Sequence, residues 1–72
     1  MALEIAQELA VRNPEWMDIQ VLVAEILGET PGAEERAAQR IAYLRNSYKL
    51  TVDLERRVLA VESEIEERRP TR

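Results

Sequence analysis

The side chains that could carry out chemistry in this chain are two serines and several pairs of carboxylates. The chain contains no histidine and no cysteine, so it lacks the commonest general base and the thiol nucleophile. No motif places a base beside Ser47 or Ser63. Carboxylate pairs such as Glu62 and Glu66 lie among arginines, whereas two-metal sites in helical proteins normally combine carboxylates with histidine. We therefore predict a protein that is not an enzyme, with no catalytic residues, no cofactor and no bound metal.

The composition describes a small chain with few large side chains. Its 72 residues are near the lower limit for a self-sufficient hydrophobic core. Trp16, Tyr43 and Tyr48 are its only aromatic residues, and many of its apolar residues are alanine or valine. Small helical scaffolds often need a disulfide, a metal or oligomerisation for stability, and without cysteine or histidine only oligomerisation remains.

The N-terminus does not resemble a secretion signal, because it lacks a positively charged region followed by a long apolar run. The most apolar segment, residues 19–27, is short and is interrupted by Gln20 and Glu25, so we expect no transmembrane helix and no contact with membranes. We expect a cytoplasmic protein that takes no small-molecule substrate.

Two helices are predicted in the N-terminal half. Apolar residues recur with helical spacing over residues 2–11. Asn13 followed by Pro14 is a helix-start signal, and Gly28 is a natural left-handed stop, which predicts a second helix over residues 14–27. Because apolar residues cover most of its circumference, we expect this second helix to be the buried central element.

A third helix is predicted to be unusually long. Thr30 followed by Pro31 repeats the start signal, and neither glycine nor proline occurs from residue 33 to residue 69. A helix over those residues would be about 55 Å long, whereas a compact domain of this size is only ~30 Å across. We therefore predict an all-α protein in which a helical hairpin (1–30) precedes one long, possibly kinked helix (31–69), followed by a frayed tail (70–72). The long helix would pack in a helical oligomer.

The third segment carries two apolar stripes that a straight helix cannot direct to one partner. The stripes are rotated by about 90–100° from each other at the ~100° per residue of an α-helix. They comprise Ala37, Ile41, Leu44 and Tyr48, and then Leu54, Val58, Val61 and Ile65. Either the helix breaks near Leu50 to Asp53, with Thr51 as a new N-cap, or its two halves face different partners. We favour a continuous or gently kinked helix.

The second stripe has the spacing of a short coiled-coil seam. We predict that Leu54, Val58, Val61 and Ile65 form an oligomer interface, with Trp16 and Tyr43 as possible partner contacts. For Trp16 the interpretation we favour is a place in the core of the hairpin, and a partner contact is the alternative. The function would be that of a small regulator, adaptor or structural subunit, which associates with itself as a homodimer or larger assembly, or with another helical protein. On this interpretation Val58→Glu dissociates the oligomer.

Charge is unevenly distributed along the chain. Residues 1–35 hold eight acidic residues and one basic residue, whereas residues 36–72 hold nine basic and six acidic residues. This polarity favours contact between copies of the chain, or with a partner of complementary charge.

An alternative function is nucleic-acid binding. Residues 24–45 contain a helix that ends in Leu27 and Gly28, a short turn with Gly32, and a basic segment, and this run resembles the helix-turn-helix of sigma-factor DNA-reading domains. The resemblance implies contacts to phosphate and bases by a basic stretch, Arg36–Lys49. Its cations are Arg36, Arg40, Arg45 and Lys49.

Two features make this alternative less favoured than protein binding. Acidic residues, Glu29, Glu34 and Glu35, lie at the start of the supposed recognition helix, where phosphate would repel them. The four cations also divide between opposite faces of that helix.

Overall fold

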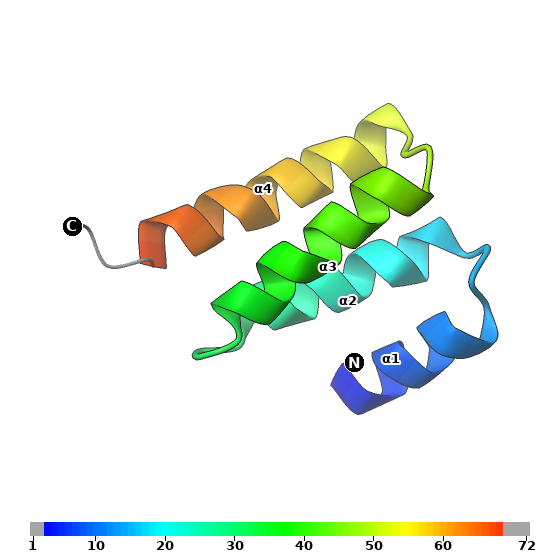
Figure 1. The fold of residues 1–72 in the computed structure, drawn as a ribbon, viewed down its shortest axis with the longest axis horizontal. Helices are drawn as coiled ribbons and strands as arrows, with labels where there is room; N and C mark the ends of the chain where they lie inside the picture. Colours follow the sequence, from blue (N-terminus) through cyan, green and yellow to red (C-terminus); the bar gives the residue numbers. More distant parts are fainter. Residues whose placement is uncertain (1–2, 69–72) are drawn as a thin grey trace.

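The computed structural model describes residues 3–68, which form four α-helices and no strand (Figure 1). The helices are α1 (Leu3–Arg12), α2 (Met17–Glu29), α3 (Glu34–Ser47) and α4 (Val52–Arg68). The predicted all-α fold is confirmed. The predicted arrangement of a hairpin and one long helix is wrong, because residues 31–69 do not form a single helix. The predicted frayed tail, 70–72, lies outside the described residues.

The long helix is interrupted between α3 and α4. Tyr48 has an extended backbone (φ −129°, ψ 150°), and its amide donates to the Leu44 carbonyl at 2.9 Å, which closes α3. The Thr51 hydroxyl then accepts a hydrogen bond from the Leu54 amide at 3.3 Å, as an N-cap residue does. Because the break falls between the two apolar stripes, α4 can turn back and bring its stripe to the same core as the stripe of α3.

All four helices share one core around α2. Helices α1, α3 and α4 each pack against α2, and α3 also packs against α4 (Figure 1). The buried apolar residues come from every helix and from the turn before α3: Ala6, Ala10, Val21, Val23, Ala24, Leu27, Ala33, Ala37, Ile41, Leu44, Leu54, Val58, Val61 and Ile65. The prediction that the second helix is the central element is confirmed. None of the described helices is long and apolar enough to cross a membrane.

The start of α2 differs from the prediction. Asn13 does not begin α2; its side-chain amide donates to the Leu9 carbonyl at 3.0 Å and so helps to end α1. Helix α2 begins at Met17, with Trp16 at the N-cap position. A side chain that can reach back to a free carbonyl serves the C-terminus of one helix as well as the N-terminus of the next, so the sequence signal was ambiguous.

The end of α2 is also misplaced in the prediction. Gly28 lies inside α2, and a Cβ built there would be 2.7 Å from Val61 Cγ1 of α4, so its role is close helix packing. The left-handed turn residue is Gly32, with a φ of 85°. Thr30 follows α2 and donates its hydroxyl hydrogen to the Ile26 carbonyl at 2.8 Å, while α3 begins only at Glu34.

The stripe on α4 lies in the core of its own chain. Leu54, Val58, Val61 and Ile65 each expose 5% of their surface or less. The radius of gyration is 11.8 Å, close to the ~11 Å expected of a compact chain of this length. Because α4 folds back, no helix is longer than the molecule can accommodate, and the apolar stripe of α4 is buried within its own chain. The two reasons for placing these residues at an interface between chains therefore no longer hold. Self-association itself stays a prediction.

We expect Val58→Glu to unfold the isolated chain, not to dissociate folded subunits. A buried carboxylate without a partner loses hydration that nothing replaces, at a cost of several kcal/mol. Leu59→Glu is the matched control, because Leu59 is 51% exposed and a surface change usually alters stability by about 0.5 kcal/mol or less. Circular dichroism melting measures both. A Val58→Glu chain that stays fully helical and melts like the wild type would contradict the assignment of α4 to the core.

We expect Gly28→Ala to lower the free energy of unfolding by about 1–2 kcal/mol, although alanine favours helix more than glycine does. The added methyl meets the stiff Val61 side chain. Val61→Ala makes room for it, so the double variant should lose less stability than the two single losses added together. Urea titration of the four proteins gives the coupling, and strictly additive losses would show that the two sites do not touch.

Candidate functional site

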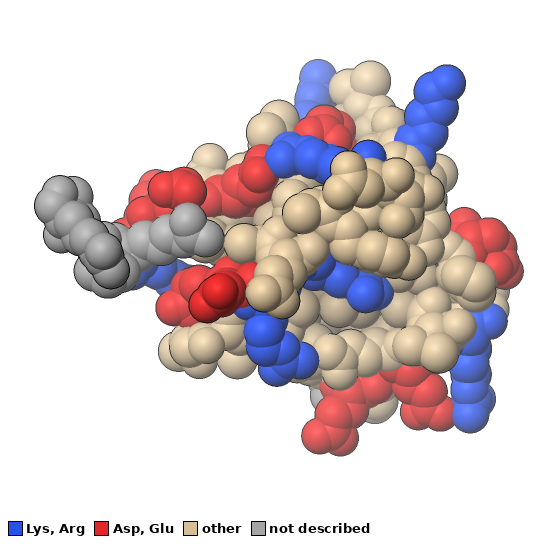
Figure 2. All heavy atoms as spheres, viewed as in Figure 1, with Lys and Arg blue, Asp and Glu red and all other residues tan. Residues whose placement is uncertain are grey.

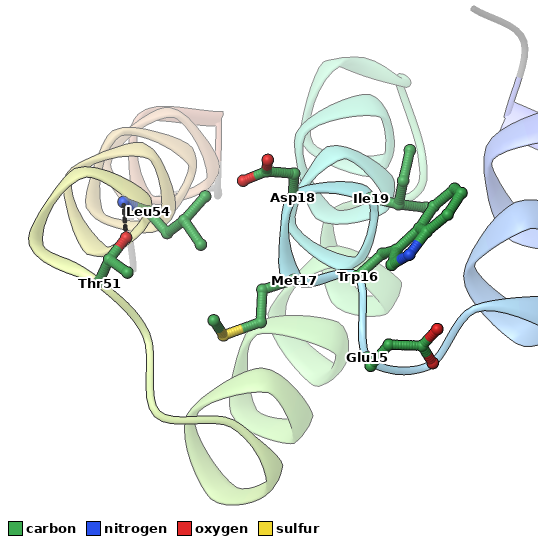
Figure 3. Close-up of a pocket in the computed structure, with 7 residues that line it drawn as sticks. All are labelled: Glu15, Trp16, Met17, Asp18, Ile19, Thr51 and Leu54. Atoms are coloured by element: carbon green, nitrogen blue, oxygen red, sulfur yellow. Dashed lines mark hydrogen bonds between the residues drawn. The ribbon is translucent and has the colours of Figure 1, made fainter.

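The most distinctive surface of the molecule is the side of α2 that the other helices cover only in part. In Figure 3, α2 has α4 on one side and α1 on the other, while α3 lies below it. The α2 residues directed to these three neighbours are buried: Gln20, Val21, Val23, Ala24, Leu27 and Gly28. The fourth side of α2, opposite α3, also carries apolar residues.

Three half-buried residues of α2 occupy this fourth side. Ile19, Leu22 and Ile26 have the spacing i, i+3, i+7, which places them along one stripe of the helix. Trp16 continues the stripe beyond the start of the helix and is 49% exposed. Figure 3 shows the Trp16 ring beside Ile19, with both side chains directed away from α3.

Helix α1 adds a fifth residue, Ile5, which is 54% exposed. Gln7 marks the flank of α1 that faces α3, because it lines a depression there together with Arg36 and Gln39. The ~100° rotation per residue of a helix places Ile5 on the opposite flank of α1, beside the uncovered side of α2. We call this surface the open face; its residues are Ile5, Trp16, Ile19, Leu22 and Ile26.

The open face continues into a groove at one end of the molecule. The groove has a volume of about 530 Å³ and lies between the start of α2 and the start of α4 (Figure 3). Its apolar lining includes Trp16, Met17 and Leu54, and its acidic lining consists of Glu15 and Asp18. Such a concave apolar surface with a polar rim suits an inserted side chain of a partner.

A buried glutamine fixes the loop that carries Trp16. Gln20 is 2% exposed, and its Nε2 donates to the carbonyls of Ala10 at 2.8 Å and Asn13 at 3.3 Å. Its Oε1 accepts from Arg40 Nη2 of α3 at 2.8 Å. The Gln20 side chain therefore provides hydrogen-bond donors for carbonyls at the end of α1 and links α1, α2 and α3. The Tyr48 hydroxyl adds a second tie by donating to the Pro14 carbonyl of the same loop.

The cations nearest to the open face are bonded within the chain. Arg57 of α4 forms an ion pair with Glu25 of α2, and this hydrogen bond raises the pKa of Arg57. Arg68 donates to the Gly28 carbonyl near the end of α2. On α1, Arg12 pairs with Glu8 at 2.8 Å. Carboxylates therefore neutralise Arg12 and Arg57, whereas Arg68, bonded to a neutral carbonyl, keeps its positive charge near the end of α2.

The two predicted partner contacts lie on different elements. Trp16 belongs to the open face, whereas Tyr43 lies on α3 and is 46% exposed. The Tyr43 ring meets Tyr48 edge to face with centroids 6.0 Å apart, and the Arg40 guanidinium lies 5.3 Å from its centroid. Tyr43 is therefore already packed by its own chain, and the structure does not bring it together with Trp16.

Two of the four cations proposed for nucleic-acid contact are engaged elsewhere. Arg45 pairs with Glu55 at 2.8 Å and with Glu62 at 2.6 Å, and these hydrogen bonds, that to Glu62 foremost, raise the pKa of Arg45. Arg40 is bound to Gln20. Arg36 and Lys49 are exposed. Figure 2 shows Lys and Arg scattered between acidic and uncharged side chains, without one continuous basic patch on this face.

Sequence reasoning missed the open face and the role of Gln20. On a helical projection, Ile19, Leu22 and Ile26 share one broad apolar side with Val23 and Leu27, and the structure buries the last two. A helical projection cannot show where neighbouring helices stop covering that side. In the sequence, Gln20 looks like a polar interruption of an apolar helix. A single amide side chain in such a helix is the signal that could have indicated a buried residue with hydrogen-bonding partners.

No protein-family model, curated protein or solved structure matches this chain. Within residues 3–68, no group of three or more acidic residues is arranged to hold a metal ion.

We expect Gln20→Ala to lower the free energy of unfolding by about 1–3 kcal/mol, since it leaves buried carbonyls and Arg40 without their partner. Gln39→Ala is the control, because Gln39 is exposed on α3. Chemical denaturation of both variants measures the difference. Equal stability of Gln20→Ala and wild type would mean that water replaces the amide at no cost.

Proposed function

We propose that this chain is a non-enzymatic protein-interaction module that binds a helix of another protein chain on the open face. The observation that carries the proposal is a contiguous apolar surface, in which the exposed side chains of Ile5 and Trp16 adjoin the partly exposed side chains of Ile19, Leu22 and Ile26. A contiguous, partly exposed apolar surface rimmed by polar residues is typical of an interaction site.

The side chains of the open face could contribute free energy to the binding of a partner. Covering a half-exposed aliphatic side chain such as Ile5 contributes about 1 kcal/mol, and covering the less exposed Ile19, Leu22 and Ile26 contributes less each. The open face presents four isoleucine or leucine side chains and one tryptophan, the residue type most enriched at binding hot spots. Several kcal/mol remain available against the entropy cost of association.

Self-association is one form of this function. With Leu54, Val58, Val61 and Ile65 in the core, a second copy would have to use other apolar groups, which are the open face and the exposed side chains of Val11, Tyr43, Val52 and Leu59. Sedimentation equilibrium of the purified chain decides this point through its mass.

Nucleic-acid binding has weaker support. Helices α2 and α3 are joined by a short turn, as the alternative requires. However, Arg40 and Arg45 hold the fold together, which leaves Arg36 and Lys49 as the free cations of the four. Titration of duplex DNA at two salt concentrations tests it, since phosphate contacts give a steep salt dependence.

A selection from a displayed library of helical peptides tests the proposed function. We expect enriched peptides that bind the wild type and lose at least about tenfold in affinity to Leu22→Gln, because a polar side chain interrupts the apolar stripe. Leu59→Gln is the matched control on α4 and should bind like the wild type. Circular dichroism confirms that both variants are folded. A selection without enrichment, or with peptides indifferent to Leu22→Gln, would contradict binding at the open face.

A further inference from the structure

We infer that the segment bound by the open face is a basic amphipathic helix of a different protein, with an apolar stripe flanked by lysine or arginine. The inference rests on the proposed function and adds the chemistry of the partner. It follows from the charges that surround the open face and from the way the chain uses its own cations.

The helices that form the open face are strongly acidic. Residues 3–29 hold six acidic residues and a single basic one, Arg12. Glu15, Asp18 and Glu29 are exposed along α2 and its preceding loop, and none of them forms an ion pair within the described residues. Glu15 and Asp18 also line the groove at the start of α2.

Within residues 3–68, the nearby cations compensate this charge only in part. Arg12 and Arg57 pair with Glu8 and Glu25, Asp18 also raises the pKa of Arg57, and Arg68 donates to the Gly28 carbonyl. Glu15, Asp18 and Glu29 have no ion-pair partner among these residues, and two of them lie together at the start of α2. A partner with cations beside its apolar stripe would pair with these acids and would be attracted to them before contact.

A second copy of the chain does not meet this requirement. A symmetric dimer places the same surface on both subunits, so the open faces would meet with their acids opposed. Like charges held together at an interface repel each other and weaken association, which is one way in which proteins reject a partner. The surface of α3 that carries Arg36 lacks an apolar stripe, since its outward residues include Glu35, Gln39 and Asn46, and Lys49 lies in the loop after α3.

The length of α2 sets the size of the partner segment. A helix of 13 residues is about 20 Å long, so a partner helix of about 14 residues spans the open face. Apolar anchors at i, i+4, i+7 and i+11 would follow the stripe from Trp16 to Ile26, with one anchor in the groove.

Two synthetic peptides test the inference. Both carry leucine at i, i+4, i+7 and i+11 and alanine elsewhere, except that the flanking positions are lysine and arginine in one and glutamate in the other. Neither contains tryptophan, so the emission of Trp16, the single tryptophan of the chain, reports binding at the open face. We expect the basic peptide to bind at least about tenfold more tightly than the acidic one, and its affinity to fall as salt is raised.

Two variants locate the effect. The double variant Asp18→Asn with Glu29→Gln should weaken the basic peptide severalfold without altering the circular dichroism melt, while Asp53→Asn with Glu64→Gln, exposed acids of α4, should change it less. Leu22→Gln should weaken both peptides.

The outcomes separate the two proposals. Equal affinity for the basic and acidic peptides, lost in Leu22→Gln, would overturn the charge inference and leave the interaction function in place. Tighter binding of the acidic peptide, or no binding of either, would also overturn it, while the library selection judges the open face independently. A sedimentation mass of a dimer that Leu22→Gln converts to monomer would assign the face to a second copy instead.

Discussion

The arrangement of the other helices depends on one constraint, which is that apolar residues cover most of the circumference of α2. A helix of this kind is stable in water only when neighbours cover it, and a single short helix cannot do so. The chain supplies three neighbours, with α1 and α4 beside α2 and α3 on a third side (Figure 1). Two of these neighbours could not both reach α2 if residues 34–68 formed one rod. The break at residues 48–51 is therefore explained by the burial of apolar side chains of α2 against both α3 and α4, since no glycine or proline lies at the break.

Polar bonds then fix how the neighbours are held. Gln20 joins α1 to α2 and α3, Arg45 joins α3 to α4, and Arg57 joins α4 to α2. The exposed ion pairs contribute little energy each, about 0–1 kcal/mol, but their directions select one arrangement of the helices. The acidic first half and the basic second half of the chain thus meet within one molecule. Part of the charge polarity that suggested contact between copies is satisfied internally.

The groups that the fold leaves without partners are the basis of the proposed function. The chain lacks the histidine and cysteine that support most catalysis, and its fold leaves exposed apolar groups together with unpaired acids on one side of α1 and α2. Both kinds of group gain when a helix of complementary pattern covers them. Two of the cations that could have met phosphate, Arg40 and Arg45, instead bind Gln20, Glu55 and Glu62, which supports the proposal of a protein partner over a nucleic acid.

Local sequence signals determined the all-α fold class, the identity of the central helix and the positions of the two apolar stripes in the second half of the chain. These features depend on helical periodicity alone. The sequence signals also identified Thr51 as a possible cap between those stripes. Where each helix ends was decided by tertiary structure. Gly28 stays helical because Val61 packs against it, and Asn13 ends α1 where it could equally have begun α2. The stripe of Leu54, Val58, Val61 and Ile65 looks the same on a helical projection whether it meets another chain or its own α2, since periodicity specifies which side is apolar and not what lies against it. Only the folded arrangement shows that α4 turns back to cover α2, and that the side left uncovered runs from Trp16 to Ile26.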